Sequence, residues 1–257
     1  MFKIIITTAL IALGATAVSA KETLRAVTAD TLSPFTRSAD EDLPGFNYEF
    51  MTAVAEEAGY ELEIEFLPWK RAQAVVAEEP GLLIFGATRN AAREDKYDWV
   101  TNLITVSRTF LTIGEPVNSM DQAKELKTIS ARSVYKRSLV KAGFTNVEES
   151  GTHSNFKKLK AGRTDAVFTV SARAVFVWSN ELSFDSAELT LGDEIGRSDI
   201  WLAASKGYDR DVIQALHAAS ERLKADGTYA ALYKRYFGDL PIYDMANPTQ
   251  APTSGSS

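Results

Sequence analysis

The chain contains no cysteine, so disulfide bonds, thiol catalysis and thiolate metal sites are all excluded. Histidine is almost as scarce, because only His153 and His217 occur in 257 residues. They lie far apart in the sequence, and no carboxylate cluster with metal-ligand spacing accompanies them. A glycine-rich phosphate loop is also missing. These absences predict a protein with no catalytic residues, no metal and no cofactor, whose fold depends on a hydrophobic core.

Blocks of lysine and arginine are absent too, and the formal net charge is −6. A protein that follows a phosphate backbone presents a basic stripe, so we expect no nucleic-acid partner. The remaining composition, with 45% apolar and 24% charged residues, is typical of a folded globular chain.

Long apolar runs are confined to the N-terminus. Lys3 precedes an apolar run from Ile4 to Leu13, and small residues follow as far as Ala20. This pattern is typical of a secretory signal, and the run is too short to cross a bilayer comfortably. A retained membrane anchor is the alternative. We expect residues 1–20 to be cleaved after Ala20, leaving a freely diffusing periplasmic monomer, since no cysteine is present to carry a lipid anchor.

Strand and helix patterns alternate along the rest of the chain. Glu61 to Phe66 alternates charged and apolar residues, as a half-buried strand does, whereas Leu82 to Phe85 is an unbroken apolar strand. Helical patterns occupy Phe46 to Ala58 and Trp69 to Glu78, and a second alternating series continues to Ala204. The order predicts an α/β protein with two lobes, each a mostly parallel sheet flanked by helices.

The domain boundaries follow from this order. Two extended segments, near Val106 to Ile113 and Ile200 to Ala204, are predicted to join the lobes as hinge crossings. The end of the chain is rich in Pro, Thr, Ser and Asn, which predicts a flexible tail. The predicted units are lobe 1 at 21–107 plus 205–240, lobe 2 at 108–204, and the tail at 241–257.

The segment LLIFGATRNAARED, Leu82 to Asp95, is the strongest candidate for ligand binding. A buried strand leads into Gly86 and Thr88 and then into a predicted helix that bears Arg93. Ligands of open α/β sheets bind at the carboxyl ends of strands. Gly86 permits close approach to the backbone, Thr88 offers a hydroxyl and an N–H, and Arg93 offers a fork for a carboxylate. The alternative is a solvated arginine among charged neighbours.

Two further strand ends carry candidates. In FLPWKRA, Trp69 follows a strand. We expect its ring to form a stacking platform for a ligand. The alternative is that Trp69 is a core residue of the next helix. In TISARSVYKRS, Arg132 and Ser133 stand between a strand and a helix. Arg132 would meet an anionic ligand from the second lobe, and a solvated arginine is again the alternative.

Four segments in order resemble the extracellular solute-binding protein family 3, the amino-acid-binding components of ABC importers. The resemblance covers Leu24 to Gly238 and implies a periplasmic binding protein fold, closure on a small ligand and a membrane permease as partner. It also implies that the last helices pack back on the first lobe. The segments are GFNYEFMTAVAEEAGYELEIEFLPW, GATRNAARE followed by YDWV, FKKLKAGRTDAVF, and ALHAASERLKADGTYAALYKRYFG.

The family's ligand contacts carry over to positions of this chain. The resemblance implies that Arg93 holds the ligand carboxylate, with Gly86 and Thr88 at the same end. It implies further contacts from the turn after the first strand, from an aromatic platform, and from the second lobe. The implied ligand-binding residues are Asp30, Trp69, Gly86, Thr88, Arg93, Arg132 and Ser133.

The chain also departs from the family pattern. Val170 stands where the family commonly has an aspartate for the ligand's α-ammonium, and the usual Gly-Thr pair near Ser133 is missing. An ammonium buried without a counter-charge costs several kcal/mol. Arg89, Arg93 and Arg132 together favour an anion. We therefore expect a carboxylate-containing solute, either an amino acid or a related organic acid.

Two other functions remain open. A ligand-sensing protein that feeds a membrane receptor would differ only in its partner. A dehydratase-like enzyme of the same fold would need an acid or base beside the ligand, and the sequence shows no convincing one.

Overall fold

The structure is a computed structural model that describes residues 21–29, 33–37 and 42–243. Helices and strands alternate along it, which confirms the α/β class. The strands are β1 (Thr23–Thr28), β2 (Glu61–Phe66), β3 (Leu83–Thr88), β4 (Asp98–Thr112), β5 (Ile129–Ala131), β6 (Val147–Glu149), β7 (Ala166–Val170), β8 (Thr190–Leu191) and β9 (Gly196–Ala204). The α-helices are α1 (Phe46–Glu57), α2 (Trp69–Glu78), α3 (Met120–Lys124), α4 (Ser133–Lys141), α5 (Thr152–Lys160), α6 (Ser171–Phe176), α7 (Arg210–Ala225) and α8 (Thr228–Phe237).

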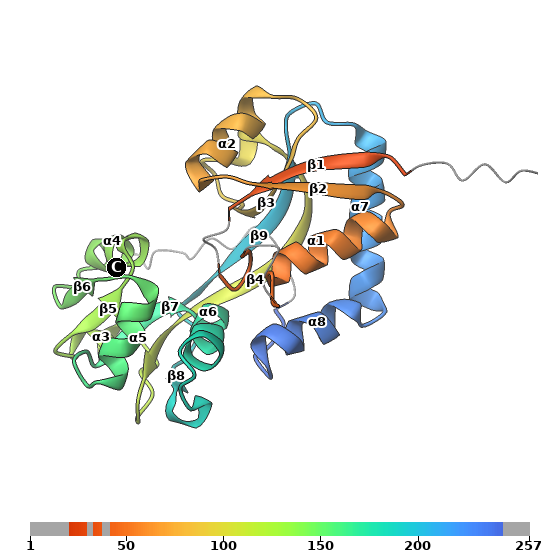
Figure 1. The fold of residues 1–257 in the computed structure, drawn as a ribbon. Coiled ribbons are helices and arrows are strands. Elements are labelled where there is room, and N and C mark those ends of the chain that lie inside the picture. Colours follow the sequence, from red (N-terminus) through yellow and green to blue (C-terminus); the bar gives the residue numbers. More distant parts are fainter. Residues whose placement is uncertain (1–20, 30–32, 38–41, 244–257) are drawn as a thin grey trace, which may run out of the picture.

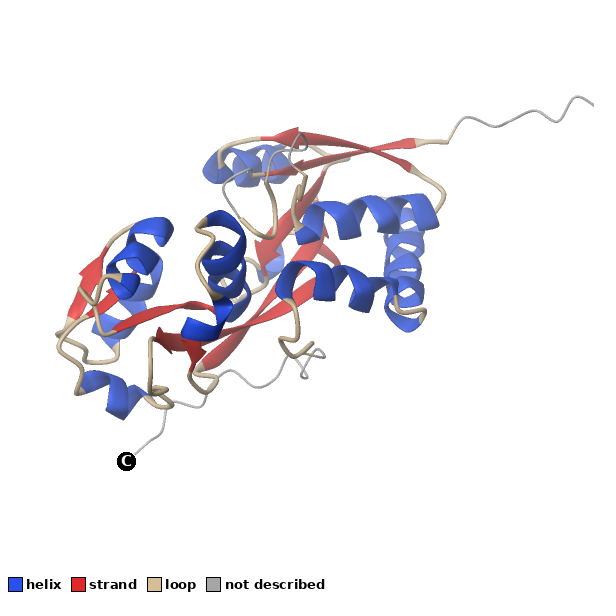
Figure 2. Ribbon diagram, turned by 60° about the horizontal axis from the view of Figure 1, so that its bottom comes forward, coloured by secondary structure: helices blue, strands red, loops and turns tan. Residues whose placement is uncertain are grey.

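The elements form two groups (Figure 1). One contains β1 to β3 with α1, α2, α7 and α8, and the other contains β5 to β7 with α3, α4 and α5. The long strands β4 and β9 run from one group into the other, and helices of each group pack beside them (Figure 2). This arrangement matches the predicted sheets flanked by helices.

A single sheet path connects the two groups, in the order β2-β1-β3-β9-β4-β7-β5-β6, with β8 paired to β4. Its two ends are parallel, since β1 pairs with β2 and β3, and β5 pairs with β6 and β7. The middle pairs, β3–β9, β9–β4 and β4–β7, are antiparallel. Each parallel set therefore aligns its own carboxyl ends at one edge of the sheet.

Strand β4 is longer than the sequence pattern predicts. It pairs with β9 from Asp98 to Arg108 and then with β7 from Arg108 to Leu111. Its upstream half buries Thr101, Asn102 and Thr105 beside apolar residues, so no alternation of apolar and polar residues marks it in the sequence. Thr101 is satisfied there by a hydrogen bond of 3.0 Å between its Oγ1 and Ser220 Oγ.

The first group is held by aromatic packing between α1 and α8. Phe46 is fully buried, and its ring centroid lies 5.3 Å from that of Tyr229 in an edge-on arrangement. Phe50 makes a similar contact with Tyr229 at 5.0 Å. The C-terminal helix thus packs back on the first group, as the resemblance implies.

The second group has a core on each face of its sheet. Phe110 of β4 and Phe168 of β7 meet on one face, with ring centroids 4.7 Å apart. On the other face, Phe156 of α5 packs edge-on against Trp178, at 6.1 Å.

Capping interactions define several helix ends. Ser119 caps α3, because its hydroxyl accepts a hydrogen bond from the Gln122 N–H at 3.2 Å. Asp209 caps α7 in the same way through the N–H groups of Asp211 and Val212. Gly59 ends α1 with φ of +90°, a conformation that disfavours side chains.

The predicted signal peptide at 1–20, most of the predicted tail and Asp30 lie outside the described residues. In the part of the chain that is described, no helix has both the length and the apolar character needed to cross a membrane.

Candidate functional site

The carboxyl ends of β1 and β3 open at the same edge of the sheet because the two strands are parallel neighbours. A buried hydrogen bond ties them, since Thr28 Oγ1 at the end of β1 donates to the Phe85 carbonyl of β3 at 3.0 Å. This edge is where the sequence places its first ligand contacts, apart from Asp30, which lies outside the described residues.

Gly86 and Thr88 both lie within β3 at this edge. Gly86 has φ of +88°, and the register of β3 against β9 shifts between Phe85 and Ala87. Such a bulge redirects the end of a strand, and glycine adopts the required φ at little cost. The bulge therefore sets the direction in which Thr88, the last residue of the strand, leaves the sheet.

Arg93 is not on an α-helix, and that prediction is wrong. Its N–H donates to the Asn90 carbonyl at 2.9 Å, and a single 3₁₀ turn, Glu94–Lys96, follows. The reason is distance along the chain: β4 begins at Asp98, so the segment after Thr88 must return to the sheet almost at once. Arg93 therefore occupies a tight turn at the carboxyl end of β3.

The Arg93 guanidinium is held at this edge by two contacts. Its Nη1 donates to the Thr88 carbonyl at 3.1 Å, and its Cζ lies 6.0 Å from the centroid of the Trp69 ring. The residue is half-buried, and no ion pair involves it within the described residues. Most of its N–H donors are thus left to bind an anion.

Trp69 is the first residue of α2 and is half-buried. Its ring packs against the core cluster that contains Val27, Leu67 and Val76, and it also lies beneath Arg93. The core interpretation is thus confirmed for part of the ring, while the other contact is with the predicted carboxylate-binding arginine.

Arg132 and Ser133 stand at the carboxyl end of β5, where the sequence places them. Arg132 precedes α4 in an extended conformation, Ser133 begins the helix, and both are half-buried. No side chain caps α4, so its first N–H groups are open to an acceptor. Because β5 is parallel to β7, Arg132 lies beside the end of β7 at Val170.

Arg173 is a candidate that the sequence analysis missed. It lies on α6, three residues after Val170, and only 7% of its surface is exposed. Burial lowers the pKa of Arg173 to about 10, and the nearby charge of Arg132 adds to the effect. The signal in the sequence is a single arginine within the apolar stretch VFTVSARAVFVW.

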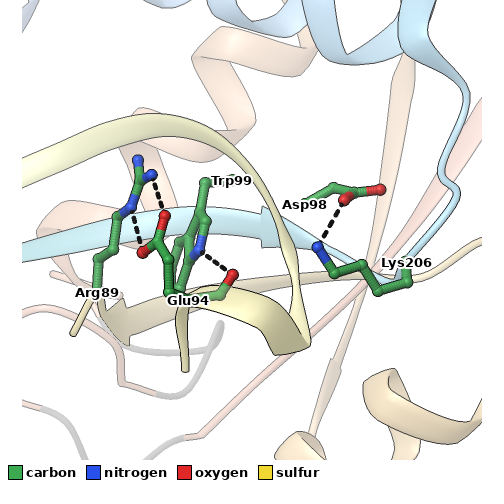
Figure 3. A network of polar contacts seen from close by, with 5 residues as sticks. All are labelled: Arg89, Glu94, Asp98, Trp99 and Lys206. Atoms are coloured by element: carbon green, nitrogen blue, oxygen red, sulfur yellow. Dashed lines mark hydrogen bonds and ion pairs between the residues drawn. The ribbon is translucent and has the colours of Figure 1, made fainter. Parts of the chain in front are cut away.

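Arg89, in contrast, is paired with Glu94 (Figure 3). Its Nε donates to Glu94 Oε2 at 2.9 Å, and its Cζ lies 4.6 Å from the Trp201 ring centroid. The hydrogen bond from Arg89 holds the pKa of Glu94 below its usual value. The two residues line a cavity of about 560 Å³ together with Trp99 and Lys206. Arg89 therefore adds little to the preference for an anion that was expected of Arg89, Arg93 and Arg132 together.

The histidines are separated in the structure as well. His217 is exposed on α7, whereas His153 Nε2 lies 2.8 Å from Glu181 Oε2. Glu181 also accepts a hydrogen bond of 2.5 Å from Ser33 Oγ. No group of three or more His, Asp or Glu side chains within the described ranges is placed to hold a metal ion.

Comparison with known proteins identifies relatives along most of the chain. The L-cystine-binding protein TcyA of Bacillus subtilis (strain 168) is 23% identical over 225 residues, covering 85% of this chain and 82% of that protein. A solved ancestral cationic amino acid solute-binding protein, AncCDT-1, superposes with a TM-score of 0.71 at 21% identity, covering 84% of this chain and 95% of its own. The second substrate-binding domain of Lactococcus lactis GlnP, in its open conformation, gives a TM-score of 0.71 at 16% identity, with 86% and 97% covered.

These likenesses support the fold described above. The family model of bacterial extracellular solute-binding proteins, family 3, matches residues 24–239, which includes both groups of elements. The chain therefore belongs to the bacterial extracellular solute-binding proteins of family 3.

Proposed function

We propose that this chain is the substrate-binding component of an ABC importer and captures a small carboxylate-containing solute, an amino acid or a related organic acid. The observation that carries the proposal is Arg93. Its guanidinium is positioned at the carboxyl end of β3 by Thr88 and Trp69, and no described residue forms an ion pair with it. A ligand carboxylate supplies the missing partner.

The two groups of elements act in this proposal as lobes, at 21–107 plus 205–240 and at 108–204. Strands β4 and β9 form the hinge. A ligand that contacts Arg93 on one lobe and Arg132 with Ser133 on the other favours the closed state, because it binds that state more tightly than the open one. The closed protein then docks on the membrane permease.

The proposal includes no catalysis. Arginine stays protonated at neutral pH, so Arg93 and Arg132 bind and orient an anion without transferring a proton. A dehydratase-like activity is the alternative, since another structure of AncCDT-1 describes it as a precursor of cyclohexadienyl dehydratase. Recovering the ligand after incubation distinguishes binding from dehydratase-like activity, because a binding protein releases its ligand chemically unchanged.

Export is the second part of the proposal. The chain is cleaved after Ala20 and diffuses in the periplasm as a monomer, and the family to which it belongs is extracellular. Intact mass of the exported protein tests the cleavage site. A sensory role is the alternative, because a histidine kinase sensor domain shares the fold with a TM-score of 0.64. Uptake of the ligand by cells with and without the protein separates transport from sensing.

A thermal-shift screen of amino acids, dicarboxylates and other small acids tests the binding function. We expect at least one acid to raise the melting temperature of the wild-type protein and none to do so for Arg93→Ala. Arg163→Ala is the matched control, because Arg163 is exposed and precedes β7 at the opposite end of the strand. Binding that survives in Arg93→Ala contradicts the proposal.

A further inference from the structure

Arg173 is a buried cation for which the described residues supply no counter-ion. It is 7% exposed, and its Nε has no hydrogen-bond acceptor in the described structure. No ion pair involves it within the described residues. A buried guanidinium is usually paired with a carboxylate, since leaving it unpaired is strongly unfavourable.

The carboxylate that acts on Arg173 does not neutralise it. Glu181 acts on Arg173 only through its field, and its two carboxylate oxygens are bound by Ser33 Oγ and His153 Nε2. Arg132 adds a second positive charge in the same region. The pKa of Arg173, lowered by burial to about 10, still leaves its guanidinium charged at neutral pH.

Arg173 lies near the strand ends that carry the proposed ligand contacts of the second group. Helix α6 begins directly after β7, whose carboxyl end is beside that of β5 and therefore beside Arg132. On the other side, the Arg173 Cζ lies 5.9 Å from the ring centroid of Phe35, which belongs to the segment that follows β1. Arg173 is thus located where the first group meets the strand ends of the second.

We propose that Arg173, together with Arg132, forms a second anion subsite, so that the ligand carries two anionic groups. One binds Arg93 on the first lobe and the other binds Arg173 and Arg132 on the second. This inference rests on the proposed function and narrows its ligand to an organic dianion such as a dicarboxylate. Val170, which is 6% exposed, adds an apolar surface and no carboxylate at the end of β7.

The test compares acids that differ only in the second charge. Isothermal titration is performed on the purified protein with dicarboxylates and with their monoamides, including succinate with succinamate and glutarate with glutaramate. The α-amino acids are titrated alongside them. We expect the dianion of a matched pair to bind at least about ten-fold more tightly than its amide, since a charge-assisted pair is lost in the amide. Arg173→Met should abolish that preference, and Arg163→Met should retain it.

A purely structural role for Arg173 gives a different result. If Arg173 is an unsatisfied charge, Arg173→Met without ligand melts at or above the wild-type temperature, because removing an unpaired buried charge relieves its desolvation. If Arg173 mainly supports the fold, the same variant melts lower. Should Arg173→Met fail to fold, Arg173→Lys and Arg132→Gln provide the measurement, and each is expected to reduce the preference for the dianion.

The outcomes separate the two proposals. If monocarboxylates bind in an Arg93-dependent manner with no preference for a second charge, or if Arg173→Met keeps the preference, the second subsite is wrong and the proposed function stands. If no carboxylate binds, or if binding survives Arg93→Met, the proposed function itself is wrong.

Discussion

The guanidinium of Arg93 lies over the indole of Trp69, with Cζ 6.0 Å from the ring centroid. The two residues come from different connections, one at the start of α2 and one in the turn after β3. Their contact positions the arginine before any ligand arrives, because the ring is itself packed on the core of the first group.

Trp69→Leu should therefore weaken ligand binding only by a few-fold. The cation–π contact of a half-exposed arginine contributes about 0.5–1 kcal/mol, and the hydrogen bond to Thr88 remains. Titration of the same acid into wild type, Trp69→Leu and Trp99→Leu measures the effect. Trp99 is the control, because it packs beside Arg89 instead of Arg93. A loss as large as that of Arg93→Ala contradicts this supporting role.

Glu181 is expected to hold the two groups together. It accepts a hydrogen bond from Ser33 of the first group, and its other carboxylate oxygen lies 2.8 Å from His153 Nε2 of the second. Its side chain is only 14% exposed. Glu181→Gln should lower the free energy of unfolding by about 1–3 kcal/mol, the range for hydrogen bonds to a charged group.

Urea denaturation at neutral pH measures this effect. Glu194→Gln is the control, since Glu194 is exposed and, among the described residues, is bonded by Arg197 three positions away. Equal stability of the two variants argues against a connecting role for Glu181.

The stability of the fold is expected to depend on pH through Asp98. Burial acts to raise its pKa, but hydrogen bonds from Lys206 Nζ and the Gly207 N–H outweigh it, so the pKa is below its usual value. A carboxylate whose pKa is lower in the folded state stabilises the fold above its unfolded pKa. That contribution is lost as pH falls through the folded pKa.

Asp98→Asn should accordingly cost about 1 kcal/mol of unfolding free energy at pH 7, a modest value because the pair is partly exposed. The difference from wild type should shrink as the pH is lowered below 4. Denaturation curves across this range provide the measurement, with the exposed Asp121→Asn as control. A difference that is constant with pH excludes the charge as the cause.

Gly45 is predicted to be intolerant of any side chain. It has φ of +122°, and a Cβ there would lie 2.6 Å from the Phe35 carbonyl oxygen. Gly45→Ala should destabilise the fold by more than about 2 kcal/mol, since clash and backbone strain add. Gly59→Ala is the matched control, because its φ is +90° but its Cβ would meet open space. It should cost about 1 kcal/mol, and thermal melts of the two variants should rank them in this order.

Much of the fold was predictable because its signals are local. The alternation in Glu61 to Phe66 corresponds to β2, and the helical spacing from Phe46 corresponds to α1. The cap at Ser119 also follows from side-chain chemistry over three residues. Strand β4 was partly missed, because Thr101 and Asn102 are buried and interrupt the apolar pattern.

The candidate site also contains features that were predictable from local sequence and one that was not. The sequence predicted Gly86, Thr88, Arg132 and Ser133 as ligand contacts because they lie at or directly after the carboxyl ends of strands that it reveals. The prediction of a helix containing Arg93 was wrong. The short connection from β3 to β4 prevents a helix there, and its length depends on which strands pair.

The sequence by itself determined the alternation of strands and helices, the family and the arginines that follow two strand ends, since these depend on side-chain periodicity over short segments. Only the tertiary structure decided which arginines keep an unmatched charge. Arg89 is paired with Glu94, Arg93 packs over Trp69, and Arg173 is buried with no ion-pair partner among the described residues. The physical reason is that burial and ion pairing depend on residues distant in the chain, which the packing of the sheet brings together.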